Sequence, residues 1–218
     1  MSSDTGKAAP ASGGFDDPQA HWDQRFSRPG LLFGEQPNRF LEREASRLPS
    51  HSRVLSVADG EGRNALYLAS LGHQVTAFDI SPVAVAKARA LAEQRELQVD
   101  WHVSSVDAWN WEGPPWDAAV AVFVQFADPP MRRRMFEGMW KSLVPGGLLL
   151  VQGYTPRQLE FRTGGPGKID NLYTADMLRG LLPEAQWLLL REYEDELAEG
   201  SAHVGRSALL DAVARKPG

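Results

Sequence analysis

A glycine-containing turn and an acid about 20 residues beyond it are the residues of this sequence best suited to hold a nucleotide. Gly60 and Gly62 follow one short apolar run, and Asp79 ends the next. Glycine has no Cβ and adopts positive φ, so backbone N–H groups in such a turn can approach a ligand closely. A carboxylate at the end of the second strand can accept hydrogen bonds from ribose hydroxyls. The spacing predicts a nucleotide site, although the glycines alone also fit a tight turn that binds nothing.

The segment around these residues predicts the elements that would position them. Residues 54–57 form a short run rich in valine and leucine, which favours a strand. From Asn64 to Gly72, apolar residues recur with helical periodicity, and glycine is a typical helix end. Residues 75–78 are apolar again and lead directly into Asp79. This order of strand, turn, helix and strand is typical of the start of a nucleotide-binding α/β domain.

The sequence VLSVADGEGRNA, at residues 54–65, resembles the first motif of class I S-adenosylmethionine-dependent methyltransferases. Its Gly-Arg-Asn ending resembles the tellurite-resistance type of bacterial small-molecule methyltransferase. The resemblance implies S-adenosylmethionine as methyl donor and a small molecule as acceptor. Ser56 stands where the motif usually has an acid, and Ala58 where it has its first glycine. Asp59 or Glu61 is then the candidate for the charge that faces the amino group of the donor.

The resemblance also extends to segments outside this motif. Trp22-x-x-Arg25-Phe26 resembles the N-terminal element that folds over the methyl donor in tellurite-resistance and thiol methyltransferases. Trp22 and Phe26, at i and i+4, could instead be one packed helix face. An acid after the third strand typically binds the adenine amino group in this class, which indicates Asp107, although that side chain could also cap a turn. The predicted donor-binding residues are Trp22, Arg25, Asp59, Gly60, Glu61, Gly62, Arg63, Asn64, Asp79, Ile80, Ser81, Val106, Asp107, Ala108 and Phe123.

Periodicity and cap residues predict the rest of an α/β fold. Asn38, Ser81, Asp128 and Thr174 precede helical patterns as N-cap candidates. The further predicted strands are residues 99–103, 117–126, 148–151, 187–193 and 207–215. The nearly continuous apolar run at 117–126 is typical of a central parallel strand. The resemblance implies a Rossmann-like seven-stranded mixed sheet, in the order 3-2-1-4-5-7-6, with strand 7 antiparallel and helices on both faces.

The domain organisation follows from composition along the chain. Residues 1–14 are small and polar and predict a disordered tail, and residues 15–218 predict a single domain that begins with cap helices over 15–48. Residues 153–172 combine glycine and proline with little periodicity, which predicts a loop on the substrate side. Arg157 and Arg162 in this loop could attract an anionic acceptor, or could be ordinary solvated charges.

Composition excludes several classes of function. The net charge is −5, and no dense block of Lys and Arg suggests a nucleic-acid partner. The chain has no cysteine, which excludes disulfides and thiolate catalysis and is consistent with a cytoplasmic location. No apolar run approaches the ~20 residues that would span a membrane. The five histidines contain no His-x-x-x-His pair, so no metal site is predicted. The oligomeric state stays open.

The chemistry of methyl transfer does not require a dedicated base. Displacement at a sulfonium neutralises positive charge, so positioning in a dry pocket can provide much of the catalysis. A thiolate or a chalcogen oxyanion needs no base, whereas a neutral amine or hydroxyl does. Tyr154 and His203 are the candidates for proton transfer, although packing or a surface position would also explain them. The alternatives are a nicotinamide-dependent oxidoreductase and a non-catalytic module that binds S-adenosylmethionine.

Overall fold

The structure is a computed structural model that describes residues 17–218, so the predicted disordered tail at residues 1–14 lies outside the described residues. The α-helices are α1 (Pro18–Phe26), α2 (Arg39–Glu44), α3 (Arg63–Ser70), α4 (Pro82–Gln94), α5 (Pro129–Ser142), α6 (Gln158–Phe161) and α7 (Ala175–Leu181). Two 3-10 helices are η1 (Ala45–Arg47) and η2 (Ile169–Asn171). The strands are β1 (Arg53–Val57), β2 (Gln74–Asp79), β3 (Asp100–Val103), β4 (Trp116–Val122), β5 (Leu143–Tyr154), β6 (Gln186–Glu199) and β7 (His203–Arg215).

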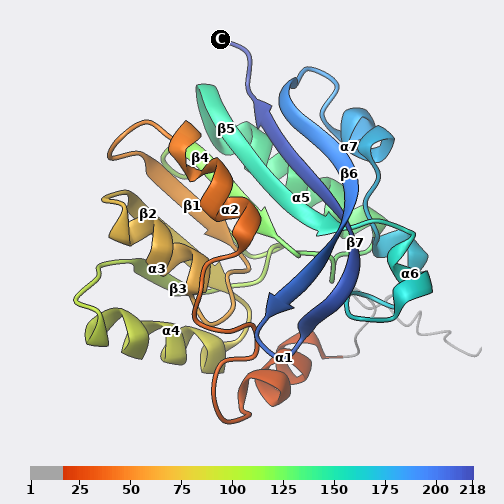
Figure 1. The fold of residues 1–218 in the computed structure, drawn as a ribbon. Coiled ribbons are helices and arrows are strands. Elements are labelled where there is room, and N and C mark those ends of the chain that lie inside the picture. The colour runs from red at the N-terminus through yellow and green to blue at the C-terminus, as the bar shows by residue number, and fades with distance from the viewer. Residues whose placement is uncertain (1–16) are drawn as a thin grey trace, which may run out of the picture.

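One mixed sheet of seven strands organises the molecule, in the order β3-β2-β1-β4-β5-β7-β6 (Figure 1). The first five strands in this order pair in parallel, and β7 runs antiparallel to both β5 and β6. Helices α2, α3 and α4 cover one face, and α5 and α7 cover the other (Figure 1). The sequence prediction of a Rossmann-like sheet with this strand order is confirmed.

Four helices begin at the cap residues that the sequence predicts. The side chains of Asn38, Ser81, Asp128 and Thr174 each accept a hydrogen bond from the backbone N–H three residues later. Each bond satisfies one of the N–H groups that the first turn of a helix leaves without an intrahelical partner. In α4 and α5, proline follows the cap and already has the φ value of a helix.

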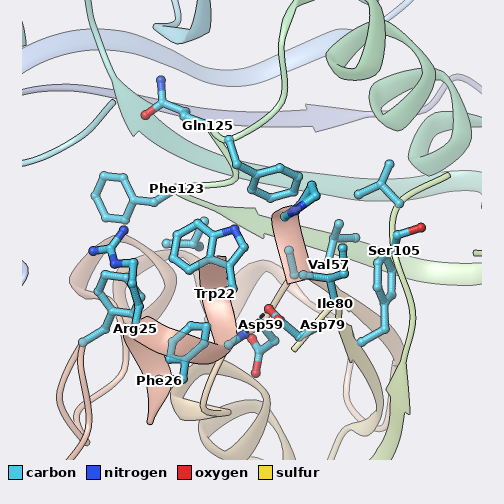
Figure 2. Close-up of a pocket in the computed structure, with 18 of the residues that line it drawn as sticks. Trp22, Arg25, Phe26, Val57, Asp59, Asp79, Ile80, Ser105, Phe123 and Gln125 are labelled. Carbon is cyan, nitrogen blue, oxygen red and sulfur yellow. Dashed lines mark hydrogen bonds between the residues drawn. The ribbon is translucent and has the colours of Figure 1, made fainter. Parts of the chain in front are cut away.

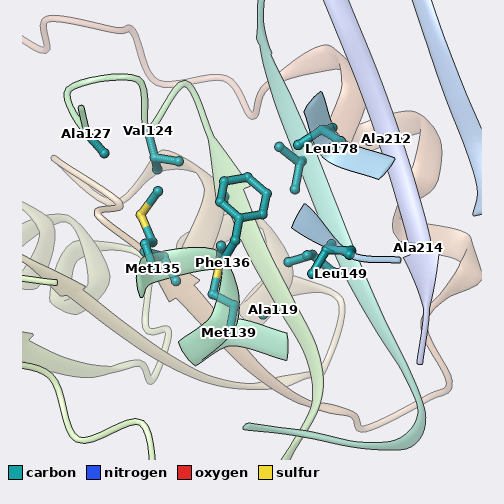
Figure 3. Close-up of a cluster of buried hydrophobic side chains, with 14 of the residues drawn as sticks. Ala119, Val124, Ala127, Met135, Phe136, Met139, Leu149, Leu178, Ala212 and Ala214 are labelled. Atoms are coloured by element: carbon teal, nitrogen blue, oxygen red, sulfur yellow. The ribbon is translucent and has the colours of Figure 1, made fainter. Parts of the chain in front are cut away.

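The core lies in two layers, one on each face of the sheet. On one face, α5 contributes Met135, Phe136 and Met139, which pack against residues of β4, β5 and β7 (Figure 3). On the other face, α2, α3 and α4 pack against the alternate residues of the same strands. In β4, for example, Ala119 faces the first layer and Ala118 the second. A strand buried on both sides explains why its sequence is continuously apolar.

The structure differs from the sequence prediction where the chain leaves the sheet. β4 ends at Val122, before the predicted Phe126, because Phe123 takes a φ of 55° and turns the chain away. The predicted loop at residues 153–172 is not structureless, since its first two residues belong to β5 and it contains α6 and η2. The side-chain amide of Gln125 donates to the backbone oxygens of Tyr154 and Asn171 and thereby fixes this region.

The last two strands are longer than predicted and form a hairpin that reaches past the sheet. They pair continuously from Leu189 to Glu199, although only the part near the sheet is apolar. At the hairpin tip, Gly200 has a φ of 62° and lies against the backbone of residues 32–34. The backbone N–H of Ser201 donates to the oxygen of Leu32 at 3.0 Å. The hairpin therefore positions the N-terminal segment next to the carboxyl ends of the parallel strands (Figure 1).

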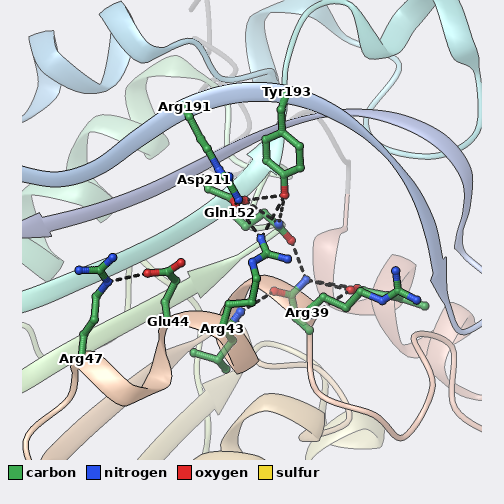
Figure 4. Close-up of polar contacts among 11 residues, drawn as sticks. Arg39, Arg43, Glu44, Arg47, Gln152, Arg191, Tyr193 and Asp211 are labelled. Atoms are coloured by element: carbon green, nitrogen blue, oxygen red, sulfur yellow. Dashed lines mark hydrogen bonds and ion pairs between the residues drawn. The ribbon is translucent and has the colours of Figure 1, made fainter.

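A buried carboxylate joins α2 to this hairpin. Asp211 on β7 is fully buried and accepts hydrogen bonds from Arg43 and Arg191 at 2.9 Å, from Tyr193 at 3.0 Å and from Gln152 at 2.8 Å (Figure 4). These partners come from α2, β5 and β6. A charge removed from water needs such a full set of donors, so the group holds α2 in register with the sheet.

Candidate functional site

A cavity of about 410 Å³ opens at the carboxyl ends of β1, β2 and β4. Its floor is the turn after β1, and α1 lies across it as a cover. Figure 2 shows Trp22 of α1 above Asp59 and Asp79, with Phe123 and Gln125 on the opposite side. Ligands of open α/β sheets bind at this position, where the strand order reverses between β1 and β4.

The turn after β1 keeps its shape although one motif glycine is missing. Ala58 adopts a φ of 49°, a left-handed conformation that costs an L-residue about 1 kcal/mol or more. Gly60, with a φ of 62°, lies beneath Phe26, and a Cβ there would come within 3.3 Å of that ring. Gly62 is also constrained, since a Cβ would lie 2.7 Å from Trp101. The turn therefore retains the motif geometry, with glycine required at positions 60 and 62.

Asp79 lies at the end of β2 and holds the turn. Its two carboxylate oxygens accept hydrogen bonds from the backbone N–H groups of Gly60 and Ser81, both at 2.9 Å. Burial raises the pKa of Asp79 to about 6, against the lowering effect of these two hydrogen bonds. A buried acid of this kind would be stabilised in its charged form by a ligand that donates hydrogen bonds or carries positive charge.

Asp59 is the second acid of the cavity and is paired with Ser56. The hydroxyl of Ser56 donates to Asp59 at 2.5 Å, and the backbone N–H of Ala65 donates to the other oxygen at 3.3 Å. Burial raises the pKa of Asp59 to about 7, although part of the residue still faces the cavity. The serine at the usual acid position of the motif thus orients an acid three residues later.

Helix α1 covers these acids with aromatic side chains. Trp22 and Phe26 stack with ring centroids 5.6 Å apart, and the guanidinium of Arg25 lies 4.9 Å from the centre of the Trp22 ring. Asp23 accepts a hydrogen bond from the hydroxyl of Ser81, which ties α1 to the start of α4. Phe26 is buried, whereas Trp22 and Arg25 line the cavity. One side of α1 therefore both packs on the domain and closes the site.

Aromatic rings and Arg63, which belongs to a buried ion pair, form a further part of the cavity wall. Tyr154 and His203 line the wall there, with ring centroids 5.7 Å apart. Arg63 at the start of α3 forms an ion pair of 2.7 Å with Glu199 of β6. Glu199 also accepts a hydrogen bond from the backbone N–H of Arg39 at 3.2 Å. Residues far apart in the sequence are joined at this wall.

The structure brings most of the predicted site residues to one cavity. Those on its wall are Trp22, Arg25, Asp59, Gly60, Arg63, Asn64, Asp79, Ile80, Val106, Asp107, Phe123, Tyr154 and His203. The carboxylate of Asp107 is also held by Arg134, at 2.9 and 3.1 Å. The predicted residues outside the wall are Glu61, Gly62, Ser81, Ala108, Arg157 and Arg162.

Each of these departures has a physical reason. The Glu61 carboxylate turns away to accept hydrogen bonds from the backbone N–H of Leu32 at 2.7 Å and from Lys87 at 2.9 Å, so Asp59 is the acid that faces the cavity. Gly62 is covered by the side chains of Trp101 and Ala88, and the Ser81 side chain caps helix α4. Ala108 is an exposed residue of the turn after β3.

The predicted substrate-side arginines also lie away from the cavity. Arg157 pairs with Glu194 at 2.6 Å, and Arg162 takes a left-handed backbone conformation at the end of α6. The part of this loop that reaches the cavity is Gly165 and Pro166.

Several cavity residues were not predicted from the sequence. Phe33, Phe78 and Ser105 line the wall, and Gln125 supports it from the turn after β4. They lie in apolar or loop segments, where the residue types alone do not show whether a side chain packs in the core or contacts a ligand. The one sequence feature that could have indicated a cavity residue was the polar Gln125 within the apolar run 117–126, which was predicted to be a strand. Among residues 17–218, no group of three or more His, Asp or Glu side chains is arranged to hold a metal ion, and no helix there is long and apolar enough to cross a membrane.

Comparison with known proteins agrees with this geometry. Residues 54–147 match the model of a family described as a methyltransferase domain. The tRNA 5-carboxymethoxyuridine methyltransferase of Escherichia coli (strain K12) is 28% identical over 159 residues, which are 67% of this chain and 60% of that protein. The chain thus spans less than two thirds of the length of this relative.

Two solved structures have the same fold. N-methyltransferase NodS from Bradyrhizobium japonicum WM9, in complex with S-adenosyl-L-homocysteine, gives a TM-score of 0.67 at 16% identity, covering 92% of this chain and 98% of that one. TehB from Haemophilus influenzae gives a TM-score of 0.65 at 20% identity, covering 80% of this chain and 60% of that one. Residues 54–147 are therefore similar to a methyltransferase domain, and the sheet has the strand order that the resemblance to class I S-adenosylmethionine-dependent methyltransferases implies.

Proposed function

We propose that the protein transfers a methyl group from S-adenosylmethionine to a small-molecule acceptor, such as a thiol, a chalcogen oxyanion or a similar small nucleophile. The observation that carries this proposal is the covered cavity, in which Asp59 and Asp79 lie beneath α1 and aromatic side chains line the wall. Such a cavity can hold the donor and the acceptor in line while water is excluded.

The acids fit a donor that carries positive charge. Asp79 would accept hydrogen bonds from the ribose hydroxyls and Asp107 from the adenine amino group. Asp59, oriented by Ser56, would face the ammonium group of the donor's methionine moiety. Burial raises the pKa of Asp59 and of Asp79, so a cationic ligand would stabilise their charged forms. The chemistry that S-adenosylmethionine supplies is an activated methyl group on a sulfonium.

The size and cover of the cavity support a small acceptor. A volume of about 410 Å³ is within the usual range for small-molecule sites, and α1 limits access from above. The net charge of −5 is unfavourable for contact with phosphate groups. A tRNA acceptor, suggested by the E. coli relative, would have to turn a base out of its stack to reach the methyl group of a bound donor. The cytoplasm is the proposed location, because the chain has no cysteine.

Two measurements test the proposal. Calorimetry with S-adenosylmethionine and with NAD should show binding of the first alone. Release of S-adenosylhomocysteine should then be followed with thiols, selenite, tellurite, phenols, small amines and total tRNA. Turnover with small acceptors is the expected result. Turnover with tRNA alone would contradict the acceptor class, and donor binding without turnover of any acceptor would indicate a non-catalytic binding module.

A further inference from the structure

A histidine next to a carboxylate forms part of the cavity wall beside Phe123. Glu199 and His203 flank the turn of the β6–β7 hairpin, and the His203 Nδ1 atom lies 3.9 Å from the Glu199 carboxylate. That distance is within the range of an ion pair but too long for a hydrogen bond. Glu199 is itself fixed by Arg63 at 2.7 Å and by the backbone N–H of Arg39 at 3.2 Å.

The imidazole is held by its aromatic neighbours in one orientation. Its ring centroid lies 4.6 Å from that of Phe33, 4.3 Å from that of Phe123 and 5.7 Å from that of Tyr154. Nδ1 is buried toward Glu199 and has no hydrogen-bond partner. Nε2 forms no hydrogen bond with any residue from 17 to 218, and it is the ring nitrogen left accessible from the cavity. The ring thus presents one free nitrogen to a bound molecule.

A purely structural histidine explains this arrangement poorly. A buried polar atom without a partner costs about 1–3 kcal/mol, and an apolar residue packed between Phe33 and Phe123 would avoid that cost. The hydroxyl of Tyr154, on the same wall, is likewise buried and has no hydrogen-bond partner. Because Nδ1 faces Glu199 and the Tyr154 hydroxyl is buried, Nε2 of His203 is the polar atom of these two side chains that a bound molecule can reach.

The surroundings of His203 keep its ring neutral near pH 7. Burial lowers its pKa, Glu199 opposes this effect, and the positive charges of Arg63 and Arg25 add to the lowering. These groups face the ring from β6, α3 and α1, while the neutral Tyr154 faces it from β5. Burial would raise the pKa of Glu199, but its interactions with His203, Arg63 and Arg39 lower it to about 2. A neutral imidazole beside a charged carboxylate is able to accept a proton.

We propose that Nε2 of His203 accepts a proton from the acceptor, and that the acceptor therefore presents a neutral hydroxyl or amine rather than an ionised thiol or oxyanion. This inference rests on the proposed methyltransferase function and, among the small nucleophiles proposed there, selects a neutral hydroxyl or amine over the thiol and the chalcogen oxyanion. The acceptor oxygen or nitrogen forms a bond to the methyl carbon. The bond from that carbon to sulfur breaks and leaves its electron pair on sulfur. The proton of the acceptor passes to Nε2 and then to water.

The experiment compares two acceptors of one shape that differ in ionisation. Phenol is neutral near pH 7, whereas thiophenol is largely ionised in slightly alkaline buffer. Aniline, an aromatic amine that is neutral near pH 7, extends the comparison from oxygen to nitrogen. Release of S-adenosylhomocysteine is measured for the wild type, for His203→Gln and for the control His102→Gln, which changes an exposed histidine outside the cavity. Calorimetry with S-adenosylmethionine checks that each variant is folded, and His203→Asn replaces His203→Gln if that variant is not.

The expected result is a selective loss. His203→Gln should lower kcat/KM for phenol or aniline by about 100-fold, while thiophenol turnover and donor affinity stay near those of the wild type. The rate of the wild type with phenol should fall as pH falls through the pKa of His203, and the rate of the variant should rise with pH as phenol itself ionises. Equal losses with phenol and thiophenol would overturn the proposal, because they would indicate packing.

A second result would also overturn the proposal. If the wild type methylates thiophenol but neither phenol nor aniline, the function stands but no base is used. Failure of the methyltransferase proposal would look different, since S-adenosylmethionine would then bind without any acceptor being methylated, in the wild type as in the variants.

Discussion

Asp79 holds the turn after β1 and also faces the cavity. Its oxygens accept hydrogen bonds from the backbone of Gly60 and Ser81, and the carboxylate lies where ribose hydroxyls of a donor would reach it. Asp79→Ala should weaken S-adenosylmethionine binding by about 1–3 kcal/mol, because hydrogen bonds to a charged group are lost. Calorimetry measures this loss, with Asp100→Ala, an exposed acid outside the cavity, as control. Unchanged affinity in a folded Asp79→Ala protein would place the ribose elsewhere.

At the same scale, the sequence predicts residues whose role depends on near neighbours. Asp59, Gly60 and Asp79 belong to one βαβ unit, so their spacing alone brings them together. Glu199 could not be found in this way, because its partner Arg63 lies 136 residues earlier. Glu61 was predicted to face the donor, yet Lys87 on the next helix draws it away. A charged side chain in a turn can point toward the cavity or toward neighbouring helices, and its tertiary partners decide which orientation it adopts.

At the scale of elements, α1 is held mostly by one side. It packs on the turn through Phe26 and bonds to α4 through Asp23, while Trp22 and Arg25 border the cavity. Bound S-adenosylmethionine would contact this side and stabilise the closed position. Hydrogen exchange of residues 20–35 should therefore slow when the donor is added, whereas exchange in α7, which packs on the far face of the sheet and does not line the cavity, should not change. Equal exchange with and without donor would mean that α1 only packs.

The tip of the β6–β7 hairpin should be intolerant of a side chain. A Cβ at Gly200 would lie 2.4 Å from the backbone carbon of Phe33, and its φ of 62° already disfavours an L-residue. Gly200→Ala should lower the free energy of unfolding by about 2 kcal/mol. Urea unfolding measures the change, with Gly167→Ala as a matched control, since that glycine has open space around it and no positive φ. Equal stability of the two variants would show that the hairpin does not hold the N-terminal segment.

The elements themselves were predictable to different degrees for a physical reason. Helix starts at Asn38 and Ser81 follow from local caps, which a sequence displays directly. The end of β4 could not be predicted from local residues, because the positive φ of Phe123 depends on contacts from β5 and the hairpin. The distal part of β6 is mostly polar and contributes only Leu197 as a buried apolar residue, so its sequence resembles a loop although the backbone pairing continues to Glu199.

At the scale of the whole molecule, Glu199 joins three distant parts of the chain. It accepts hydrogen bonds from Asn38 and Arg39 at α2, pairs with Arg63 at α3, and lies on the hairpin. Removing one partner from a buried ion pair leaves the other charge without compensation. Glu199→Gln should therefore lower the free energy of unfolding by about 3 kcal/mol near pH 7. Glu194→Gln, which breaks pairs to largely exposed arginines, should cost less than about 1 kcal/mol.

The Glu199 carboxylate also makes the free energy of unfolding depend on pH. The pKa of Glu199 is about 2 in the folded protein and 4.5 when unperturbed. Because the folded state binds this proton less readily, the stabilisation is complete above pH 4.5 and is lost as pH falls through 4.5 toward 2. Urea unfolding at pH 7, 5 and 3 should show the wild type losing its advantage over Glu199→Gln as pH falls. A difference that stays constant from pH 7 to pH 3 would show that the charge of Glu199 does not hold these three segments together.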